Sequence, residues 1–567
     1  LTQEIYFTIF VVLCACARAQ IRVTTSEGVV VGSPASDGNY TAFYGIPYAG
    51  NVDGSNRFKH APPPTPYNVL ETAPNIIGDV ICAQPSSRGI IGVENCLRVS
   101  IFTTNVTSPK PVLVWLNAEE YTSSLTHRVA SFKTFVDQGI VVVSMNFRLS
   151  VFGFLCLGVE AAPGNAGIKD IIQGLEWINR NIAGFGGNPN NVMLMGHGSA
   201  AALVDIVTIV PRAQNLVHKA VTLSGSVLAP WAISYTPINS AISLAEAIGF
   251  NTHRKTPDEI AQHLLQTGSS LLNGPLSSYK YPNNTLLFAP CIENSRINPN
   301  ESVLTEPPLK MLEEGNYTHI PYITAYVTEE GTIRAEEAVL GTWLQRMNNN
   351  FDEFLPVGLD YGSNRTVIGQ NIRNTYFSGQ IDMGSVQDYL DYIGDTSVVV
   401  PVIRGAVARA NTSRNAVRLM EFGYKGTFNT DWLYTQIQLD GVKHGGILNF
   451  LFNFDLAPND LRVLNSVVSR FSSFAHTGIP MLTVDNNFYQ WSEISRTNLL
   501  YMQDAGSAQS LTYQVQERQE PHSIIMNFWN NLYARHYVPP NPVSSAGTFA
   551  AVFYTVLISF MLTKYVL

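Results

Sequence analysis

The stretch "VMLMGHGSAAALV" (residues 192–204) joins two apolar runs through a short turn of small residues. The run that ends at this turn, residues 191–196, is typical of a strand buried on both faces of a sheet. The run that follows directly, residues 199–210, is read as a helix. A strand that leads straight into a helix indicates an α/β fold.

Other segments extend this pattern in both directions. Apolar runs at residues 111–116, 139–147 and 219–225 are typical of further buried strands. Between them, residues 169–185 place five apolar side chains on one face at helical spacing: Ile171, Ile172, Leu175, Ile178 and Ile182. We therefore predict a mostly parallel central sheet with helices on both faces. The second half of the chain has weaker periodicity and is read as mixed helix and loop.

Composition and charge exclude several classes of protein. The 567 residues are 46% hydrophobic and 14% charged, which is enough apolar sequence for a large core. The formal net charge is -8 and there is no basic run, so a nucleic-acid partner is not expected. Because no repeat, low-complexity block or flexible linker divides the chain, residues 20–540 are predicted to form one domain.

Both ends of the sequence are apolar. Residues 1–19 hold an apolar run followed by Ala17-Arg18-Ala19, which predicts a signal peptide that is cleaved before Gln20; a buried helix is the alternative. Residues 541–567 contain a second uncharged apolar run, near 549–562, behind a cluster of small residues. This segment predicts membrane attachment through a GPI signal or a short transmembrane helix, with a core helix as the third possibility.

The predicted secretory route agrees with the sequons and the cysteines. Seven asparagines stand in Asn-x-Ser/Thr sequons and are candidate glycosylation sites: Asn39, Asn105, Asn283, Asn300, Asn316, Asn364 and Asn411. Once the leader is removed, four cysteines remain in an oxidising compartment. Cys82 and Cys96 are close enough in sequence to close a small loop and are the favoured disulfide. Cys156, in an apolar segment, is predicted to be a buried free thiol.

Motifs along residues 21–537 resemble those of type-B carboxylesterases and cholinesterases. They include "FYGIPYA", "NCLRVSIFT", "NFRLSVFGFL", "GNAGIKD", "FGGNPNNV", "TLSGS" and "TEEG". The resemblance implies an α/β-hydrolase fold with a deep gorge, a disulfide between Cys82 and Cys96, and a catalytic triad of Ser, Glu and His.

The resemblance also shows where the nucleophile should stand. In this fold it is the serine of GxSxG, on a sharp turn between a strand and a helix. Aligning "GHGSA" with that pattern puts Gly198 at the position of the serine, and glycine tolerates the strained backbone of such a turn. Ser199 is a possible substitute nucleophile, but a shift of one residue redirects the side chain by roughly 100°.

The oxyanion loop departs from the family pattern as well. Active relatives have HGGG after the preceding strand, where backbone amides bind the oxyanion. This chain has Asn117, Ala118, Glu119 and Glu120 in that place. A carboxylate 4 Å from the developing oxyanion would cost about 4 kcal/mol at an effective dielectric constant of ~20, or roughly three decades in rate.

The other two triad positions look intact. Glu330, in "TEEGT", aligns with the triad acid, and His444, in "GVKHGG", aligns with the triad base. These residues alone do not establish activity, because both could be retained to hold neighbouring loops together. The two lesions together predict a catalytically inactive protein, with Gly198, Glu330 and His444 as a degenerate triad.

The predicted loss of catalytic activity leads to a hypothesis for function. Members of the family without the serine, such as neuroligins, gliotactin, neurotactin and glutactin, act in adhesion, so the chain is predicted to be a cell-surface recognition glycoprotein with an extracellular protein partner. One alternative is a residual carboxylic-ester hydrolase that uses Ser199. Another is a protein that binds a small molecule in the former gorge. We expect neither a cofactor nor a metal.

Residues 522–537 form a further candidate interface. Ile524, Ile525, Phe528, Trp529 and Leu532 make an apolar stripe at helical spacing. Helices near the C-terminus pair in active relatives, so a homodimer is one hypothesis; packing of the stripe into the core is the other.

Overall fold

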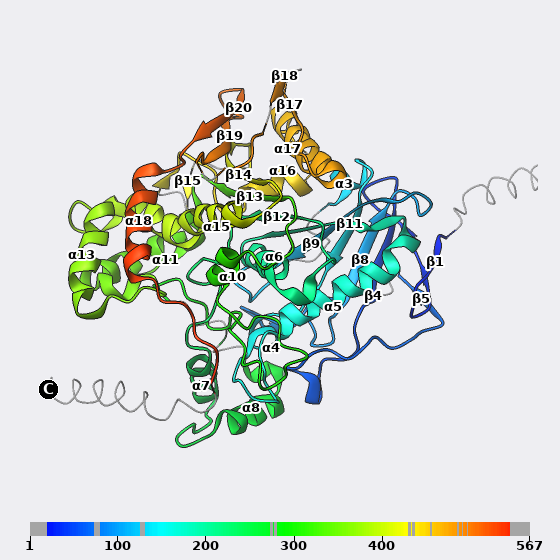
Figure 1. Ribbon diagram of the computed structural model, residues 1–567, viewed down its shortest axis with the longest axis horizontal. Coiled ribbons are helices and arrows are strands. Elements are labelled where there is room, and N and C mark those ends of the chain that lie inside the picture. The colour runs from blue at the N-terminus through cyan, green and yellow to red at the C-terminus, as the bar shows by residue number, and fades with distance from the viewer. Residues whose placement is uncertain are drawn as a thin grey trace, which may run out of the picture.

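The central β-sheet positions every residue of the candidate site. The computed structural model describes residues 20–72, 80–124, 131–272, 276, 281–428, 432–433, 437–453, 456–484, 487–489, 491–495 and 497–544. Its main sheet has 11 strands in the order β20-β19-β14-β13-β12-β11-β9-β10-β8-β4-β3. The seven strands from β19 to β10 are parallel to one another, and antiparallel strands complete both edges (Figure 1).

The strands of this sheet are β3 (Ser33–Pro34), β4 (Thr41–Pro47), β8 (Arg98–Thr103), β9 (Lys110–Asn117), β10 (Val141–Met145), β11 (Gly187–His197), β12 (Lys219–Leu223), β13 (Tyr322–Val327), β14 (Val417–Lys425), β19 (Leu500–Ser507) and β20 (Thr512–Gln519). The smaller sheets contain β1 (Arg22–Thr24), β2 (Val29–Val31) and β5 (Val69–Glu71); β6 (Gln84–Ser86) and β7 (Gly89–Ile91); β15 (Trp432–Leu433) and β16 (Ile437–Gln438); and β17 (Leu482–Val484) and β18 (Asn487–Tyr489).

The α-helices are α3 (Lys133–Val136), α4 (Ser150–Phe154), α5 (Ala166–Asn181), α6 (Ser199–Ile209), α7 (Pro237–Ala247), α8 (Pro257–Gln266), α10 (Pro308–Glu314), α11 (Ala335–Val339), α12 (Trp343–Asn349), α13 (Arg365–Tyr376), α14 (Val386–Gly394), α15 (Val400–Thr412), α16 (Asn449–Phe452), α17 (Pro458–Thr477) and α18 (Ser523–His536). Short 3₁₀ segments include η2 (Ile182–Phe185), η5 (Glu330–Arg334) and η10 (Gly446–Leu448), and a π-helical turn, η9 (Asp395–Val399), joins α14 to α15.

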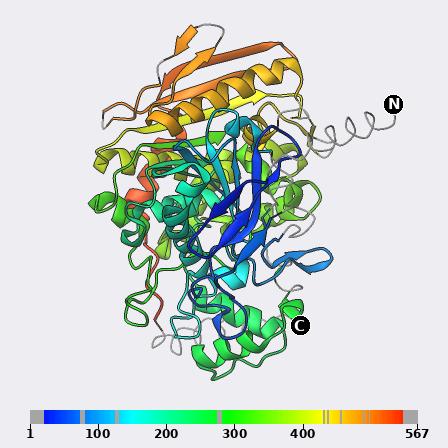
Figure 2. The same cartoon turned by 90° about the vertical axis from the view of Figure 1, so that its right-hand side faces the viewer.

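Alternate residues of the parallel strands bury into two separate cores, one on each face of the sheet. Along β9, Val112, Val114 and Leu116 belong to the core that also contains residues of α5, α6 and α15. Leu113 and Trp115 belong to the core that contains residues of α3, α16 and α17. The period of two follows from the pleat of a strand. Helices therefore cover both faces, and α7 and α8 lie at the opposite end of the molecule from β19 and β20 (Figures 1 and 2).

The predicted fold class is confirmed in its main features. The strands predicted at 111–116, 139–147, 191–196 and 219–225 overlap β9, β10, β11 and β12, and the helices predicted at 169–185 and 199–210 overlap α5 and α6. The second half of the chain contributes β13, β14 and β19 to the same sheet. The sequence did not predict β14 and β19 because Arg418 and Glu421 in β14, and Gln503 and Asp504 in β19, interrupt the apolar run that is typical of a buried strand.

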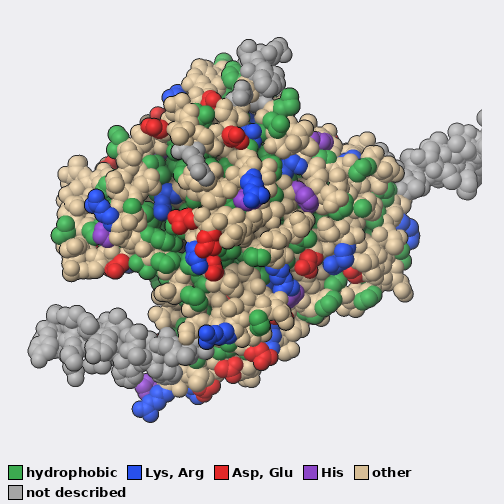
Figure 3. Space-filling view, viewed as in Figure 1, with side chains coloured by type: hydrophobic (Ala, Val, Ile, Leu, Met, Phe, Trp, Pro, Cys, Tyr) green, Lys and Arg blue, Asp and Glu red, His purple; other side chains and the backbone are tan. Residues whose placement is uncertain are grey.

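The charged surface agrees with the composition. On the face drawn in Figure 3, acidic and basic side chains are interspersed rather than gathered by sign. Six of the seven sequon asparagines are exposed and Asn283 is half-buried. Their glycosylation stays a prediction. The predicted signal peptide and the apolar run near 549–562 lie outside the described residues. Within the part of the chain that is described, no helix is both long and apolar enough to cross a bilayer.

Both pairs of cysteines form disulfides. The bond between Cys82 and Cys96 confirms the favoured pairing. The prediction that Cys156 is a free thiol is wrong, because Cys156 is bonded to Cys291, 135 residues further along the chain. The two cysteines meet beside Gly164, where a Cβ would lie 2.6 and 2.8 Å from their sulfur atoms. Sequence spacing cannot reveal such a long-range contact. Two disulfides are consistent with the secretory pathway.

We expect loss of the Cys156–Cys291 bond to destabilise the protein more than loss of the Cys82–Cys96 bond. A disulfide stabilises the folded protein by lowering the entropy of the unfolded chain. On this basis the 135-residue loop of Cys156–Cys291 contributes about 5 kcal/mol and the 14-residue loop of Cys82–Cys96 about 3 kcal/mol. Urea unfolding of the two Cys→Ser double variants measures the difference, with peptide mapping under non-reducing conditions to identify the remaining bond. Equal stabilities would contradict this order.

Candidate active site

Gly198 forms a sharp turn between β11 and α6. Its backbone has φ 59° and ψ -126°, a conformation that side-chain-bearing residues rarely adopt, and its N–H donates to the carbonyl of Leu223 at 2.9 Å. Gly196 makes the turn possible, because a Cβ there would lie 2.7 Å from the carbonyl group of Ala200. The strand-turn-helix geometry predicted for this stretch is therefore present.

The carboxylate of Glu119 occupies the space beside this turn. A Cβ built on Gly198 would lie 2.8 and 2.9 Å from the two carboxylate oxygens of Glu119. Contacts under 3.0 Å are shorter than carbon and oxygen tolerate, so a side chain at position 198 would have to displace this carboxylate. The side chain that fills this space comes from the loop after β9 and not from the elbow itself.

Glu330 and His444 form a hydrogen-bonded pair across the same edge of the sheet. Nδ1 of His444 lies 2.5 Å from Oε2 of Glu330. The other carboxylate oxygen of Glu330 accepts from the backbone N–H of Val327 at 2.8 Å, and the backbone N–H of His444 donates to Oγ1 of Thr332 at 2.9 Å. The structure thus brings together the two residues that the sequence aligned with the triad acid and base.

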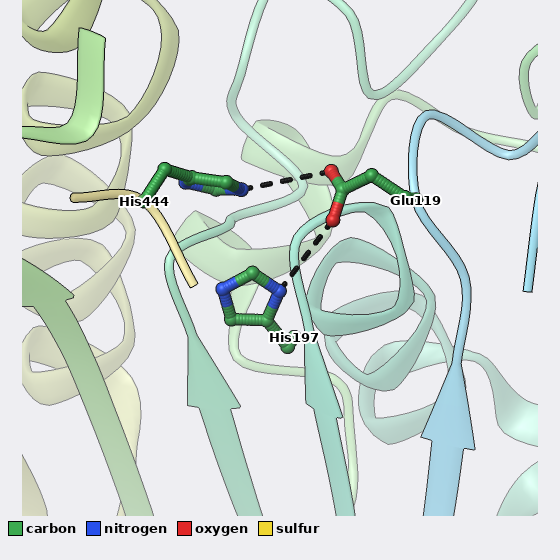
Figure 4. A group of neighbouring side chains, drawn as sticks. All are labelled: Glu119, His197 and His444. Atoms are coloured by element: carbon green, nitrogen blue, oxygen red, sulfur yellow. Dashed lines mark ion pairs between the residues drawn. The ribbon is translucent and has the colours of Figure 1, made fainter. Parts of the chain in front are cut away.

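Glu119 lies between two imidazoles (Figure 4). Its Oε1 is 3.6 Å from Nε2 of His444, and its Oε2 is 3.6 Å from Nδ1 of His197. The two imidazole rings are 4.7 Å apart between centroids. His197, the last residue of β11, stands at the variable position of the elbow motif, and the sequence analysis did not predict it as a site residue. Its place directly before the turn, at the carboxyl end of a central strand, was the available signal.

The surrounding carboxylates favour positive charge at His444. Burial alone would lower the pKa of this imidazole, but Glu330 and Glu119 outweigh burial and raise the pKa to about 10. The buried Glu330 and the half-exposed Glu119 approach the ring from its two nitrogens.

Ser199 is turned toward the loop after β9. Its hydroxyl donates to the carbonyl of Ala118 at 3.0 Å and accepts from the backbone N–H of Tyr121 at 2.9 Å. The side chain is buried. Both hydrogen-bonding roles of the hydroxyl are thus used in anchoring the loop to the start of α6, which does not match the alternative in which Ser199 attacks a substrate.

The loop that aligns with the oxyanion loop uses the N–H of Glu119 within itself and is bonded to α6. It spans Asn117 to Glu120. The N–H of Glu119 donates to the carbonyl of Ser123 at 2.7 Å, and the N–H of Ala200 donates to the carbonyl of Ala118 at 3.4 Å. Glu120 has a positive φ of 50° and forms an ion pair with Arg334. The two adjacent carboxylates therefore differ: Glu120 is paired, and Glu119 faces the imidazoles.

A pocket opens over this cluster. It encloses about 350 Å³, including the part open to solvent. Its floor is polar, with Glu119, His444 and the backbone at Gly198, and part of its wall is apolar: Trp231, Leu286, Ile333 and Val398. An apolar wall with a few converging polar groups is the usual character of a site for small molecules.

Known proteins resemble the chain over most of its length. The model of the carboxylesterase family matches residues 19–524. A juvenile hormone esterase of Tribolium castaneum is 26% identical, with 82% of this chain and 85% of the relative aligned. A carboxylic ester hydrolase of Bombus ignitus is also 26% identical, covering 87% of this chain and 90% of the relative.

A solved structure confirms the fold. The crystal structure of juvenile hormone esterase from Manduca sexta, with OTFP covalently attached, superposes with a TM-score of 0.78. It covers 91% of this chain and 100% of the esterase chain at 23% identity. At this identity the likeness supports the predicted α/β-hydrolase fold.

The comparisons correct the prediction of an inactive adhesion protein. The relatives that align with most of the chain are named as esterases, so an ester-hydrolysing function is favoured over a pseudoenzyme. Those relatives lend no support to the resemblance to neuroligin-like adhesion members. The prediction failed because it took the changes at Gly198 and in the oxyanion loop as two independent losses. A carboxylate from a neighbouring loop occupies the space at Gly198 that the sequence left unfilled.

The His444–Glu330 pair should activate a serine placed at the elbow once Glu119 no longer fills the space. We expect the double variant Gly198→Ser/Glu119→Gly to react with a fluorophosphonate at position 198, and Gly198→Ser alone to react at least about tenfold more slowly because its Cβ meets the Glu119 carboxylate. The positive φ should cost the variants about 1–3 kcal/mol of stability. Peptide mapping of the adduct is the measurement.

Adding His444→Ala to the double variant is the matched control, and it should remove the labelling. Equal labelling of the single and double variants would show that Glu119 does not obstruct the elbow.

Proposed function

Because the chain belongs to the carboxylesterase family, we propose that it hydrolyses carboxylic esters in the pocket above Glu119, Gly198 and His444, with water as the attacking group. Water is proposed because the elbow carries no hydroxyl at Gly198 and the hydroxyl of Ser199 is held by the neighbouring loop. The family relatives named as esterases support the reaction type.

One observation carries this proposal. The imidazole of His444 is oriented by Glu330 through Nδ1, and its other nitrogen is directed at the Glu119 carboxylate on the pocket floor. An imidazole that is fixed through one nitrogen and faces a pocket with the other can move a proton at a defined place. The site therefore has the acid-base pair of an esterase, His444 and Glu330, but no serine as the attacking group.

The proposed reaction balances with water as the only co-reactant. The water oxygen bonds to the ester carbonyl carbon, and a proton from the water passes to the Glu119–His444 cluster. The tetrahedral intermediate then breaks its bond to the alcohol oxygen, and the alcohol leaves with a proton from the cluster. The products are a carboxylic acid and an alcohol, and the cluster returns to its first state.

The pocket wall indicates the class of ester. Trp231, Leu286, Ile333 and Val398 provide apolar surface beside the polar floor. Arg334, the arginine of the lining, is paired with Glu120. We therefore propose uncharged esters with an apolar acyl or alcohol group as substrates; the names of two relatives, juvenile hormone esterases, agree with this class.

The place of action is a separate proposal. We propose that the chain passes through the secretory pathway and is held at a membrane by the apolar segment within residues 541–567. The sequons, the disulfides and the apolar character of that segment support it.

Ester hydrolysis is tested with the purified chain and p-nitrophenyl esters of increasing acyl length. We expect turnover above the rate in buffer, with His444→Ala and Glu119→Gln each lowering kcat/KM by about 100-fold or more, the size of a lost acid-base contribution. His253→Ala is the matched control, because His253 is exposed on the segment between α7 and α8. Turnover that is absent, or equal in the wild type and in His444→Ala, would overturn the proposal.

A further inference from the structure

We propose that Glu119, His197 and His444 together bind one divalent cation of the zinc class. Each residue offers one ligand atom, and these atoms all lie within 4.8 Å of one another. Two imidazoles and one carboxylate form a donor set that zinc uses where a further position stays open for water or substrate. The binding site stands on this geometry alone; the catalytic use of the cation rests on the proposed ester hydrolysis.

The spacing of the ligand atoms fits a tetrahedral cation. Zinc binds nitrogen and oxygen at about 2.0–2.2 Å, so two ligands of a tetrahedral site are separated by about 3.3–3.5 Å. Oε2 of Glu119 lies 3.6 Å from Nδ1 of His197, and Oε1, the other oxygen of the same carboxylate, lies 3.6 Å from Nε2 of His444. Direct hydrogen bonds between nitrogen and oxygen are shorter, about 2.7–3.2 Å. The 3.6 Å between each imidazole nitrogen and its Glu119 oxygen is longer than a hydrogen bond and close to the distance between two ligands of one zinc ion.

Unpartnered nitrogens point to a missing ligand. The side chains of His197 and His444 are 5% and 9% exposed. Nε2 of each ring is buried without a hydrogen-bond partner among the described residues, and only His444 turns this nitrogen toward Glu119, because His197 faces Glu119 with Nδ1. Buried polar atoms are nearly always paired in native proteins, so an orphan atom requires an explanation. For His444, the orphan nitrogen is the one that faces Glu119 (Figure 4).

Glu330 supplies the support that a metal-binding histidine normally has. Nδ1–H of His444 donates to the Glu330 carboxylate, so a cation would bind at Nε2 and release the proton that this nitrogen holds in the charged imidazole. A carboxylate behind a ligating histidine fixes the tautomer and the ring orientation and makes the ligand more basic. Glu330 is itself held by the N–H of Val327. The former triad acid thus has the place of an outer-shell carboxylate.

The glycine at the elbow makes room for this arrangement. Glu119 reaches the imidazoles through the volume that a side chain on residue 198 would fill. The cation would also resolve an electrostatic conflict. The Glu119 carboxylate alone opposes the negative charge that develops on an ester carbonyl during hydrolysis. A divalent ion held by this carboxylate reverses the sign and supplies an electrophile at the pocket floor.

Zinc binding is measured first on the full chain, expressed without a histidine tag and through a eukaryotic secretory pathway so that both disulfides form. We expect titration calorimetry with ZnCl₂ to give one site per chain. Glu119→Gln, His197→Ala and His444→Ala should each weaken that site by roughly 100-fold or more, and Glu330→Gln by about 10–100-fold, as for an outer-shell partner. His253→Ala should bind zinc like the wild type.

Circular dichroism of each variant checks folding. Glu119→Gln is the decisive substitution if a histidine variant fails to fold, because this side chain lies on the pocket loop and is 41% exposed. Loss of the site in Glu119→Gln with retained structure supports the proposal. An unchanged site in Glu119→Gln, or no saturable zinc binding to the wild type, overturns it.

Ester hydrolysis measured with and without a chelator separates this inference from the proposed function. Zinc binding without any turnover supports the metal site and overturns the function. Turnover that a chelator does not change, in a chain that binds no zinc, supports the function and overturns the metal site. Turnover lost to the chelator and restored by added zinc supports both.

Discussion

The left-handed backbone at Gly198 is the constraint on which the site depends. With φ at 59°, the chain reverses within one residue and passes from the end of β11 to the start of α6. The turn is also crowded, because a Cβ on Gly225 would lie 2.2 Å from the carbonyl oxygen of Gly198. This close approach fixes the elbow against the strand edge. Its lack of a side chain leaves the volume that Glu119 enters.

The parallel sheet explains why the reactive groups meet at this edge. Glu119 follows β9, His197 ends β11 and Glu330 follows β13, so all three stand at the carboxyl ends of parallel strands. Side chains at such ends converge even when they are far apart in sequence. His444 comes from the segment after β16 and is attached to the same edge by its backbone bond to Thr332.

Much of this arrangement could be predicted from the sequence, and the reasons for the failures are physical. The central strands and the helices α5 and α6 were predictable from apolar runs and helical periodicity. The pairing of Glu330 with His444 was predictable through the family resemblance. The disulfide of Cys156 and the position of the Glu119 carboxylate were not, because both depend on contacts between segments that the sequence does not place. His197 could be placed at the sheet edge from its position before the turn, but the sequence did not show that Glu119 and His444 lie beside it.

The absent serine and the altered oxyanion loop are one coupled change rather than two independent losses. Glu119 can lie against the elbow only because residue 198 has no Cβ, and a side chain at 198 would displace its carboxylate. The same loop keeps the second carboxylate, Glu120, away from the imidazoles by pairing it with Arg334. If the two changes are counted separately, each one argues against catalysis. In the structure they are connected, because the Glu119 carboxylate fills the volume that a side chain on residue 198 would fill. Whether this site stabilises the oxyanion of ester hydrolysis depends on the charge next to Glu119. A carboxylate alone repels a developing oxyanion, whereas a carboxylate that binds a cation brings a positive charge that attracts it.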